Sequence, residues 1–248
     1  SKYWQMVSAY WGSKPLIPCD IAVNLIEENI TSFMKEMESV CKEQSLNSSN
    51  IVVIGASKTQ NMDSIEQAYK AGVANFGENY LQEAEEKIKE CDLDICWHFI
   101  GSIQKRKCKK IAALFDWVHT LERIEVAEKL NAGREGNINK LNVCVQVNID
   151  HEESKSGIAL EEVNSFVKEL KDMENLRIRG LMAIPDPSLN PEKSILSFRK
   201  LKDKFEELKA LNEDVDSLSM GMSGDYREAI MEGSSMIRIG TSIFGKRT

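Results

Sequence analysis

The chain has 248 residues, of which 42% are hydrophobic and 29% charged, and its formal net charge is -7 at pH 7. This composition is typical of a soluble globular protein, and the acidic balance argues against nucleic acid or an anionic membrane as a partner. No run approaches the roughly 18 uninterrupted apolar residues of a membrane span. Lys14, Pro15 and Pro18 interrupt the N-terminal segment in a way that does not match a signal peptide, so we expect a cytoplasmic protein. The six cysteines form no C-x-x-C pair, which indicates reduced thiols and no metal site.

The N-terminal part of the chain divides at about residue 20. Residues 1–20 show no clear period, and the sequence assigns this arm no role. From Ile21 to about Gln44, apolar residues recur at helical spacing, which predicts an amphipathic helix with a stripe of Ile26, Ile30, Phe33, Met37 and Val40. We expect this helix to belong to a single domain that covers residues 21–248.

After this helix, short apolar or β-branched runs alternate with amphipathic segments. The predicted strands are IVVIGAS (51–57), VANFG (73–77), WHFIG (97–101), WVHT (117–120), LNVCVQVNI (141–149), IRGLMAI (178–184), DSLSMG (216–221) and MIRIG (236–240). Each strand but the last is followed by a predicted helix, at about 62–71, 80–90, 104–115, 123–131, 160–173, a long segment ending near Leu211, and 225–231.

Eight such βα units in a chain of about this length predict a (β/α)8 barrel with an additional N-terminal helix. The alternative is an open, doubly wound sheet. That fold usually carries a G-x-G-x-x-G turn after an early strand, whereas the segment after Ser57 reads KTQNMD. We therefore predict the barrel.

The carboxyl ends of barrel strands carry the chemistry, and Lys58 follows the first of them. An ammonium group there is costly to desolvate, so it either extends to water along its own stem or performs a chemical task. The loops after strands seven and eight offer glycines, hydroxyls and a cation that suit a phosphate, among them Ser223, Arg238, Gly240 and Thr241. A lysine opposite a phosphate site suggests a Schiff base with a phosphorylated aldehyde, either pyridoxal phosphate or a sugar phosphate.

Two other features have simpler interpretations. His98 lies between aromatic residues and is predicted to be a core histidine with one hydrogen-bonded nitrogen, while His119 and His151 show no metal-ligand spacing. The basic run QKRKCKK at 104–110 is predicted to be a solvated helix face.

Several longer motifs, in the same order along the chain, resemble the pyridoxal phosphate homeostasis proteins, which are single-domain relatives of the alanine racemase barrel. The resemblance covers nearly everything after residue 21. It is carried by IGASKT (54–59), FGENY (76–80), WHFIGSIQKRK (97–107), QVNIDHEESKSGI (146–158), IRGLMAI (178–184), LSMGMSGDYREAI (218–230) and GSSMIRIGTSIFG (233–245).

The resemblance implies that Lys58 holds pyridoxal 5'-phosphate as a Schiff base and that Asn79 lies beside the ring. It further implies that Ser223, Gly240 and Thr241 hold the phosphate, and that Arg238 faces the pyridine nitrogen. Such a protein is expected to be a monomer that takes part in vitamin B6 homeostasis without efficient turnover, with apo-enzymes that use the cofactor as recipients.

The alternative function is a pyridoxal-phosphate-dependent amino-acid racemase. Racemisation requires a second acid/base on the opposite face of the ring. The sequence offers Tyr80, Tyr226 and His98 for that role.

Overall fold

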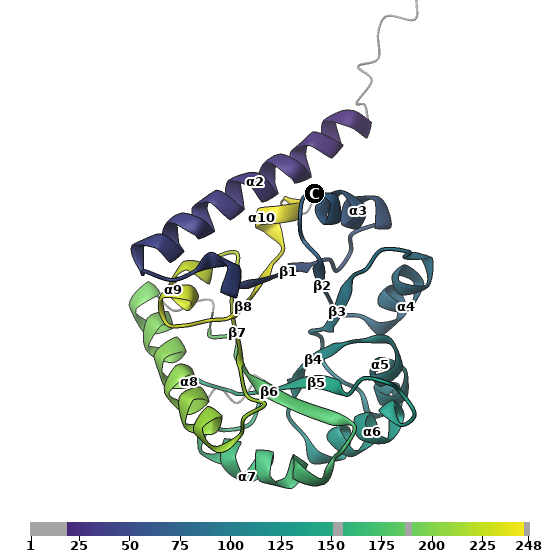
Figure 1. Ribbon diagram of the computed structural model, residues 1–248, viewed down its shortest axis with the longest axis vertical. Helices are drawn as coiled ribbons and strands as arrows, with labels where there is room; N and C mark the ends of the chain where they lie inside the picture. The colour runs from purple at the N-terminus through teal and green to yellow at the C-terminus, as the bar shows by residue number, and fades with distance from the viewer. Residues whose placement is uncertain (1–18, 151–155, 187–189, 246–248) are drawn as a thin grey trace, which may run out of the picture.

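The computed structural model describes residues 19–150, 156–186 and 190–245. The predicted N-terminal arm, apart from its last two residues, lies outside the described residues, as do His151 and Lys155. Below, helices and strands carry the labels of Figure 1.

Eight parallel strands close into a barrel in chain order, with β1 paired to β8, so the predicted (β/α)8 fold is confirmed (Figure 1). The strands are β1 (Val52–Ala56), β2 (Asn75–Glu78), β3 (Cys96–Phe99), β4 (Trp117–Leu121), β5 (Leu141–Gln146), β6 (Leu176–Met182), β7 (Ser217–Met222) and β8 (Met236–Ile239). Because every strand runs in the same direction, all eight carboxyl ends meet at one rim.

Helices follow the strands and cover the outside of the barrel (Figure 1). They are α3 (Met62–Lys70), α4 (Leu81–Glu90), α5 (Cys108–Leu114), α6 (Ile124–Arg134), α7 (Val163–Glu169), α8 (Pro191–Leu211) and α9 (Tyr226–Met231). Asn190 caps α8, since its side chain accepts a hydrogen bond from the backbone N–H of Lys193. Pro191, at the first position of the helix, has no backbone N–H that would need an acceptor.

The structure differs from the sequence prediction in the details of several helices. The helix predicted at 104–115 begins with a 3-10 turn, Lys105–Lys107, before α5. A short helix, α10 (Thr241–Phe244), follows β8, where none was predicted. The helix predicted at 160–173 contains one α-helical stretch, α7, between the 3-10 turns Leu160–Glu162 and Leu170–Asp172. Apolar periodicity continues through such turns, so it does not mark where an α-helix tightens.

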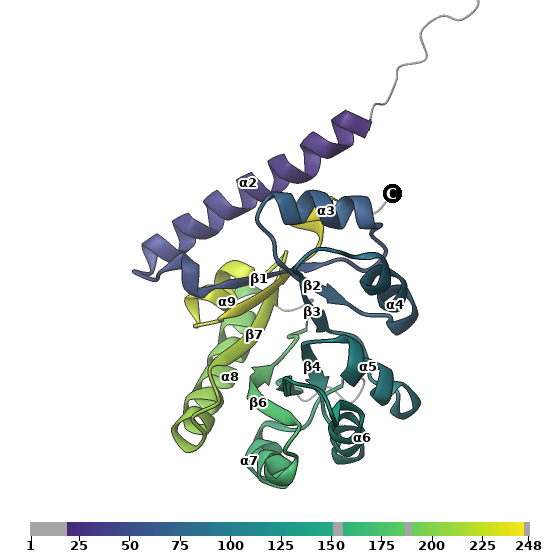
Figure 2. The same ribbon diagram turned by 45° about the vertical axis from the view of Figure 1, so that its right-hand side comes forward.

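The N-terminal helix α2 (Cys19–Glu43) is the additional helix that the sequence predicts. Its apolar stripe is buried, and the helix packs against α3, α9 and α10 (Figure 2). Phe33 meets the ring of Tyr226 on α9 edge-on, with 5.1 Å between ring centroids. The side-chain amide of Asn29 donates to the carbonyl oxygen of Ile243, 3.0 Å away, and so ties α2 to α10.

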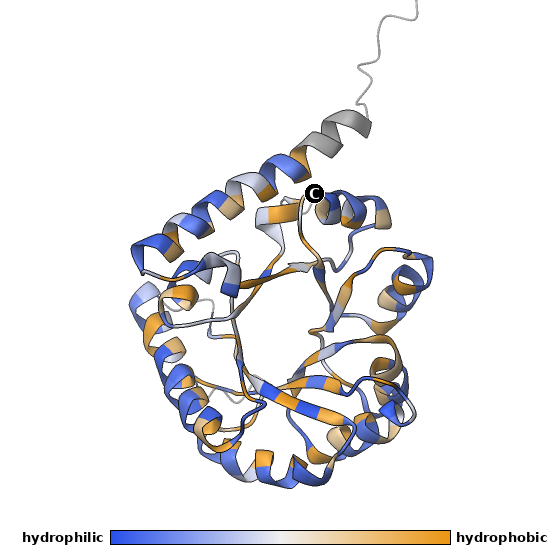
Figure 3. Ribbon diagram, in the orientation of Figure 1, coloured by the Kyte–Doolittle hydropathy of each residue, from blue (hydrophilic) through white to orange (hydrophobic). Residues whose placement is uncertain are grey.

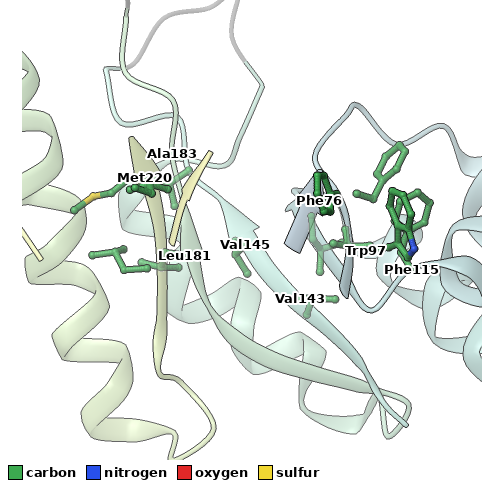
Figure 4. Close-up of a cluster of buried hydrophobic side chains, with 14 of the residues drawn as sticks. Phe76, Trp97, Phe115, Val143, Val145, Leu181, Ala183 and Met220 are labelled. Carbon is green, nitrogen blue, oxygen red and sulfur yellow. The ribbon is translucent and has the colours of Figure 1, made fainter. Parts of the chain in front are cut away.

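Apolar side chains form two separate layers. The larger layer fills the space between strands and helices, and Figure 4 shows part of it around Phe76, Trp97 and Phe115. The smaller layer consists of strand residues alone, and these cross the interior of the barrel: Val52, Ile54, Cys96, Trp117, Cys144, Met182 and Met236. Helix surfaces that face away from the strands are largely hydrophilic (Figure 3), as the sequence pattern requires.

No helix in the described ranges is long and apolar enough to cross a membrane. The five cysteines whose side chains are described carry free thiols. Most of the basic run is exposed to solvent, and Lys105 and Lys110 pair with Glu125 and Glu85. These contacts agree with the predicted solvated face.

Candidate functional site

Lys58 lies just beyond the carboxyl end of β1, which stops two residues earlier at Ala56. Its side chain is half-buried, and within the described ranges its amine forms no hydrogen bond or ion pair. Ser57 beside it is fully buried. A strand-end amine without a partner is available for chemistry.

A cavity of about 260 Å³ opens at this rim beside Lys58. Five of the six predicted site residues line it, namely Lys58, Ser223, Arg238, Gly240 and Thr241. Gly224, which the sequence places in the same phosphate-binding loop as Ser223, also lines the cavity. The other lining residues were not predicted from the sequence, and they are Ala56, Gln60, Met222, Phe244 and Gly245. Each is close in sequence to a predicted site residue, so proximity along the chain was the signal that could have found them.

Ser223 bridges the loops after β7 and β8. Its hydroxyl oxygen accepts hydrogen bonds from the backbone N–H groups of Gly240, at 3.3 Å, and Ser242, at 3.4 Å. A Cβ atom at Gly240 would lie 3.6 Å from the Cβ of Ala56, within the cavity that both residues line. The two loops therefore present N–H and O–H groups to a small open volume, which suits an anion.

Arg238 extends from β8 into the barrel and is almost completely buried. One terminal nitrogen of its guanidinium donates to the hydroxyl of Ser219, at 2.5 Å, and the other donates to the carbonyl oxygen of Ala183, at 3.1 Å. Burial lowers the pKa of Arg238 to about 10, and the nearby Asp225 opposes that shift. The group still carries its charge at neutral pH.

A chain of hydrogen bonds continues from Arg238 across the interior of the barrel. Nδ1 of His119 is 2.8 Å from the Ser219 hydroxyl, and its Nε2 is 2.9 Å from Nδ1 of His98. Nε2 of His98 is 3.0 Å from the side-chain oxygen of Asn75. Thus both ring nitrogens of His98 have partners, whereas the sequence predicted one.

The donor and acceptor roles along this chain of hydrogen bonds follow from the groups at its two ends. The oxygen of Asn75 only accepts, so Nε2 of His98 donates to it, and each link back to Ser219 then has one donor and one acceptor. This assignment requires both imidazoles to be neutral. Burial favours the same state, since it lowers the pKa of His98 to about 3 and that of His119 well below its usual value.

Asn79, the sixth predicted residue, follows β2 and does not line the cavity. Its side-chain oxygen is buried and has no hydrogen-bond partner in the part of the chain that the structure describes. The loop after β3 packs closely on its backbone, because a Cβ at Gly101 would come 2.0 Å from the carbonyl oxygen of Asn79. The backbone of Asn79 is therefore tightly packed near the rim, and its side-chain oxygen remains available to accept a hydrogen bond.

The residues around the cavity fit pyridoxal phosphate. An amine without a partner suits its aldehyde, a buried guanidinium suits its ring nitrogen, and the N–H and O–H groups beside Ser223 suit its phosphate. Metal ligands are not part of this arrangement, since the described residues contain no group of three His, Cys, Asp or Glu placed to hold an ion.

A larger cavity, of about 800 Å³, lies at the other end of the barrel, between α7, α8 and the start of β6. It contains none of the predicted site residues. In a barrel of this kind, chemistry is found at the carboxyl ends of the strands, so the smaller cavity is the candidate site.

Comparison with known proteins places the chain in a family. Residues 29–248 match the family model described as alanine racemase, N-terminal domain. A pyridoxal phosphate homeostasis protein of Haemophilus influenzae is 43% identical over 227 residues, which are 90% of this chain and 96% of that protein. The structure of PipY of Synechococcus elongatus, with PLP bound, is similar with a TM-score of 0.77 and 29% identity over 89% of this chain and 100% of that chain.

An alanine racemase of Clostridium difficile, in complex with cycloserine, shares the fold. Its TM-score is 0.67 at 17% identity, and the match covers 91% of this chain but 59% of the racemase. The racemase thus has a large part without a counterpart here. Sequence identity, coverage and fold agree that this chain belongs to the pyridoxal phosphate homeostasis proteins, within the family of the alanine racemase N-terminal domain.

Proposed function

We propose that this protein binds pyridoxal 5'-phosphate at the cavity beside Lys58 and takes part in cytoplasmic vitamin B6 homeostasis as a monomeric carrier, without efficient turnover. The observation that carries the proposal is the convergence of Lys58, Arg238 and the Ser223 loop on one cavity of about 260 Å³. The Haemophilus relative is named a pyridoxal phosphate homeostasis protein, and PipY has PLP bound.

The proposed covalent link is a Schiff base. The amine nitrogen of Lys58 would condense with the aldehyde carbon of the cofactor, and the aldehyde oxygen would leave as water. Ser223, the N–H of Gly240 and the hydroxyl of Thr241 would hold the phosphate, Arg238 would face the ring nitrogen, and Asn79 would lie beside the ring. When bound, the cofactor supplies an electron-withdrawing ring.

Arg238 bears on the expected absence of efficient turnover. A guanidinium with a pKa of about 10 donates hydrogen bonds but does not surrender its proton at neutral pH, so a ring nitrogen that faces it stays unprotonated. An unprotonated ring withdraws electrons less effectively from the α-carbon of an amino acid.

The described residues of the cavity lining also include no second acid/base. Tyr80 is 61% exposed, Tyr226 packs against Phe33, and His98 is committed to the buried hydrogen-bond chain. None of the three lines the cavity. Release to a recipient apo-enzyme is supported by the position of the cavity at the surface, since Gly224 and Thr241 are both exposed.

Borohydride reduction tests the proposal directly. Purified protein loaded with pyridoxal phosphate and reduced should carry a pyridoxyl group on the peptide that contains Lys58, and mass spectrometry should locate it there. Lys58→Ala is the matched control and should lose both the label and the visible absorbance. A label confined to another lysine would overturn the assignment, and a colourless parent that labels Lys58 only with a sugar phosphate would support a sugar-phosphate enzyme.

The absence of turnover is a separate prediction. The loaded parent should racemise L-alanine no faster than free pyridoxal phosphate does, because a ring nitrogen that faces Arg238 would stay unprotonated and the described cavity lining offers no second acid/base. Chiral chromatography of the amino acid measures this. A rate well above that of the free cofactor, lost in Lys58→Ala, would show that the protein is a racemase.

A further inference from the structure

We propose that Lys87 is a positioning residue for Lys58, and that it acts by holding the backbone on both sides of Lys58 through a buried ion-pair cluster of Lys87, Glu78 and Glu83. This inference rests on the proposed Schiff base at Lys58. It adds a role for three charged side chains that do not line the cavity.

Lys87 extends from α4 into the protein and is 6% exposed. Its ammonium donates three hydrogen bonds: to the carbonyl oxygen of Ser57 at 2.8 Å, to Oε1 of Glu78 at 2.8 Å and to Oε1 of Glu83 at 2.6 Å. An ammonium group has three N–H donors, so its capacity is fully used. A surface lysine that only solubilises a helix would not be buried and saturated in this way.

The two carboxylates extend the cluster to the same loop. Oε1 of Glu78 also accepts from the hydroxyl of Ser57, at 2.6 Å, and Oε1 of Glu83 accepts from the backbone N–H of Thr59, at 2.5 Å. Lys58 is the one residue between these two anchored neighbours. The cluster therefore fixes the chain immediately before and immediately after the amine-bearing residue.

The backbone at Thr59 shows why such anchoring is required. Thr59 has φ of +66°, in the left-handed region that β-branched residues rarely adopt. Without the bond to Glu83, the turn would relax towards an ordinary conformation and move Lys58 with it. A Schiff base forms efficiently only when the amine nitrogen is held close to the aldehyde carbon in the right direction.

Charge balance makes Lys87 the central member of the cluster. Glu78 is fully buried, and burial raises the pKa of its carboxyl, while the hydrogen bonds from Lys87 and Ser57 oppose that shift. Its second oxygen, Oε2, has no hydrogen-bond partner within the described ranges. Removal of Lys87 would leave Glu78 buried with one hydroxyl donor, so the carboxylate would take up a proton or draw in water, and the bond from Lys87 to the carbonyl oxygen of Ser57 would be lost.

The test compares two ligands that differ at the reactive carbon. Pyridoxal phosphate forms the Schiff base, whereas 4'-deoxypyridoxine phosphate lacks the aldehyde and binds through phosphate and ring contacts alone. In Lys87→Met, the affinity for pyridoxal phosphate should fall at least about tenfold relative to the affinity for the analogue, because a displaced amine weakens only the covalent link. The absorbance band of the Schiff base and the rate of borohydride labelling should fall with it.

Two further variants make the comparison decisive. Lys89→Met is the matched control on the same helix: the Lys89 side chain is 67% exposed and pairs only with Glu85, so both affinities should match those of the parent. The double variant Glu78→Gln with Lys87→Met removes the uncompensated buried charge. It provides the same readout if Lys87→Met alone fails to fold, as judged by circular dichroism and urea denaturation.

Two outcomes would overturn the proposal. In a folded Lys87 variant, the ratio of the two affinities could stay at the parental value, either because neither affinity changes or because both fall equally. Either result would show that the cluster supports the fold and does not position the amine. Equal affinity of the parent for both ligands, without labelling of Lys58, would instead reject the Schiff base and with it this role.

Discussion

Three residues at the rim of the barrel contribute different chemical groups to the candidate site. Lys58 offers an amine without a partner in the described ranges, Arg238 carries a buried charge, and the hydroxyl of Ser223 joins two loops by accepting from the N–H groups of Gly240 and Ser242. The sequence predicted each of these residues because each lies at or near the carboxyl end of a strand. It did not predict Lys87 or Glu83, which lie on a helix where charged residues are ordinary.

The phosphate contacts give a prediction at this scale. The double variant Ser223→Ala with Thr241→Ala should bind pyridoxal phosphate roughly 10²- to 10⁴-fold more weakly, since each hydroxyl would donate a charge-assisted hydrogen bond worth about 1.5–3 kcal/mol. Equilibrium dialysis measures the affinity. Ser242→Ala keeps its backbone N–H and is the control. Parental affinity in the double variant would place the phosphate elsewhere.

Among the elements, α2 connects the N-terminal part of the chain to the site. It packs on α9 and α10, and Asn29 holds the carbonyl oxygen of Ile243 in α10. Because α10 begins beside Gly240, the position of the β8 loop depends on this packing. The helical stripe in the sequence predicted that α2 exists, but not that it supports the cavity.

The contact between α2 and α9 can be tested by truncation. Phe33→Ala should lower the free energy of unfolding by about 3–5 kcal/mol, because it leaves a cavity beside Tyr226 and removes an edge-on ring contact. Urea denaturation measures the loss. Lys35→Ala, at an exposed position of the same helix, should change stability by no more than about 0.5 kcal/mol. Similar midpoints for both variants would show that α2 contributes little to the barrel.

At the scale of the whole molecule, the interior of the barrel contains both an apolar layer and a chain of hydrogen-bonded polar side chains. His98 stacks on Trp117, with 5.6 Å between ring centroids, and the chain from Asn75 to Arg238 crosses the same interior. Both imidazoles are fully buried, and burial favours their neutral forms. The folded protein therefore binds protons at these groups less readily than the unfolded chain does.

This difference predicts how stability depends on pH. Burial lowers the folded pKa of His98 from 6.5 to about 3, so the unfolded state gains a proton first as the pH falls. The free energy of unfolding should decrease below about pH 6.5 and continue to decrease towards pH 3, by up to about 1.4 kcal/mol per pH unit for each histidine. His119, whose pKa is also lowered by burial, adds in the same direction.

Urea denaturation of the parent and of His98→Gln between pH 7 and pH 4 tests this expectation. Glutamine retains a donor and an acceptor at this position but does not titrate. The slope of stability against pH should be shallower in the variant by about 1.4 kcal/mol per pH unit below pH 6. Parallel slopes would show that His98 does not control the acid sensitivity of the fold.

The architecture and several residues of the cavity lining could be predicted from the sequence alone. Alternating strand and helix periods specify the barrel, and the barrel brings every strand end to one rim, so Lys58, Ser223, Arg238, Gly240 and Thr241 could be placed together from their positions in the chain. Only the tertiary structure decided which buried polar groups meet. The partners in the chain from His119 to Ser219 are 100 residues apart, and Lys87 reaches Ser57 across 30 residues. Such contacts depend on strand register and on how each helix rotates against the barrel, and neither leaves a periodic signal in a single sequence.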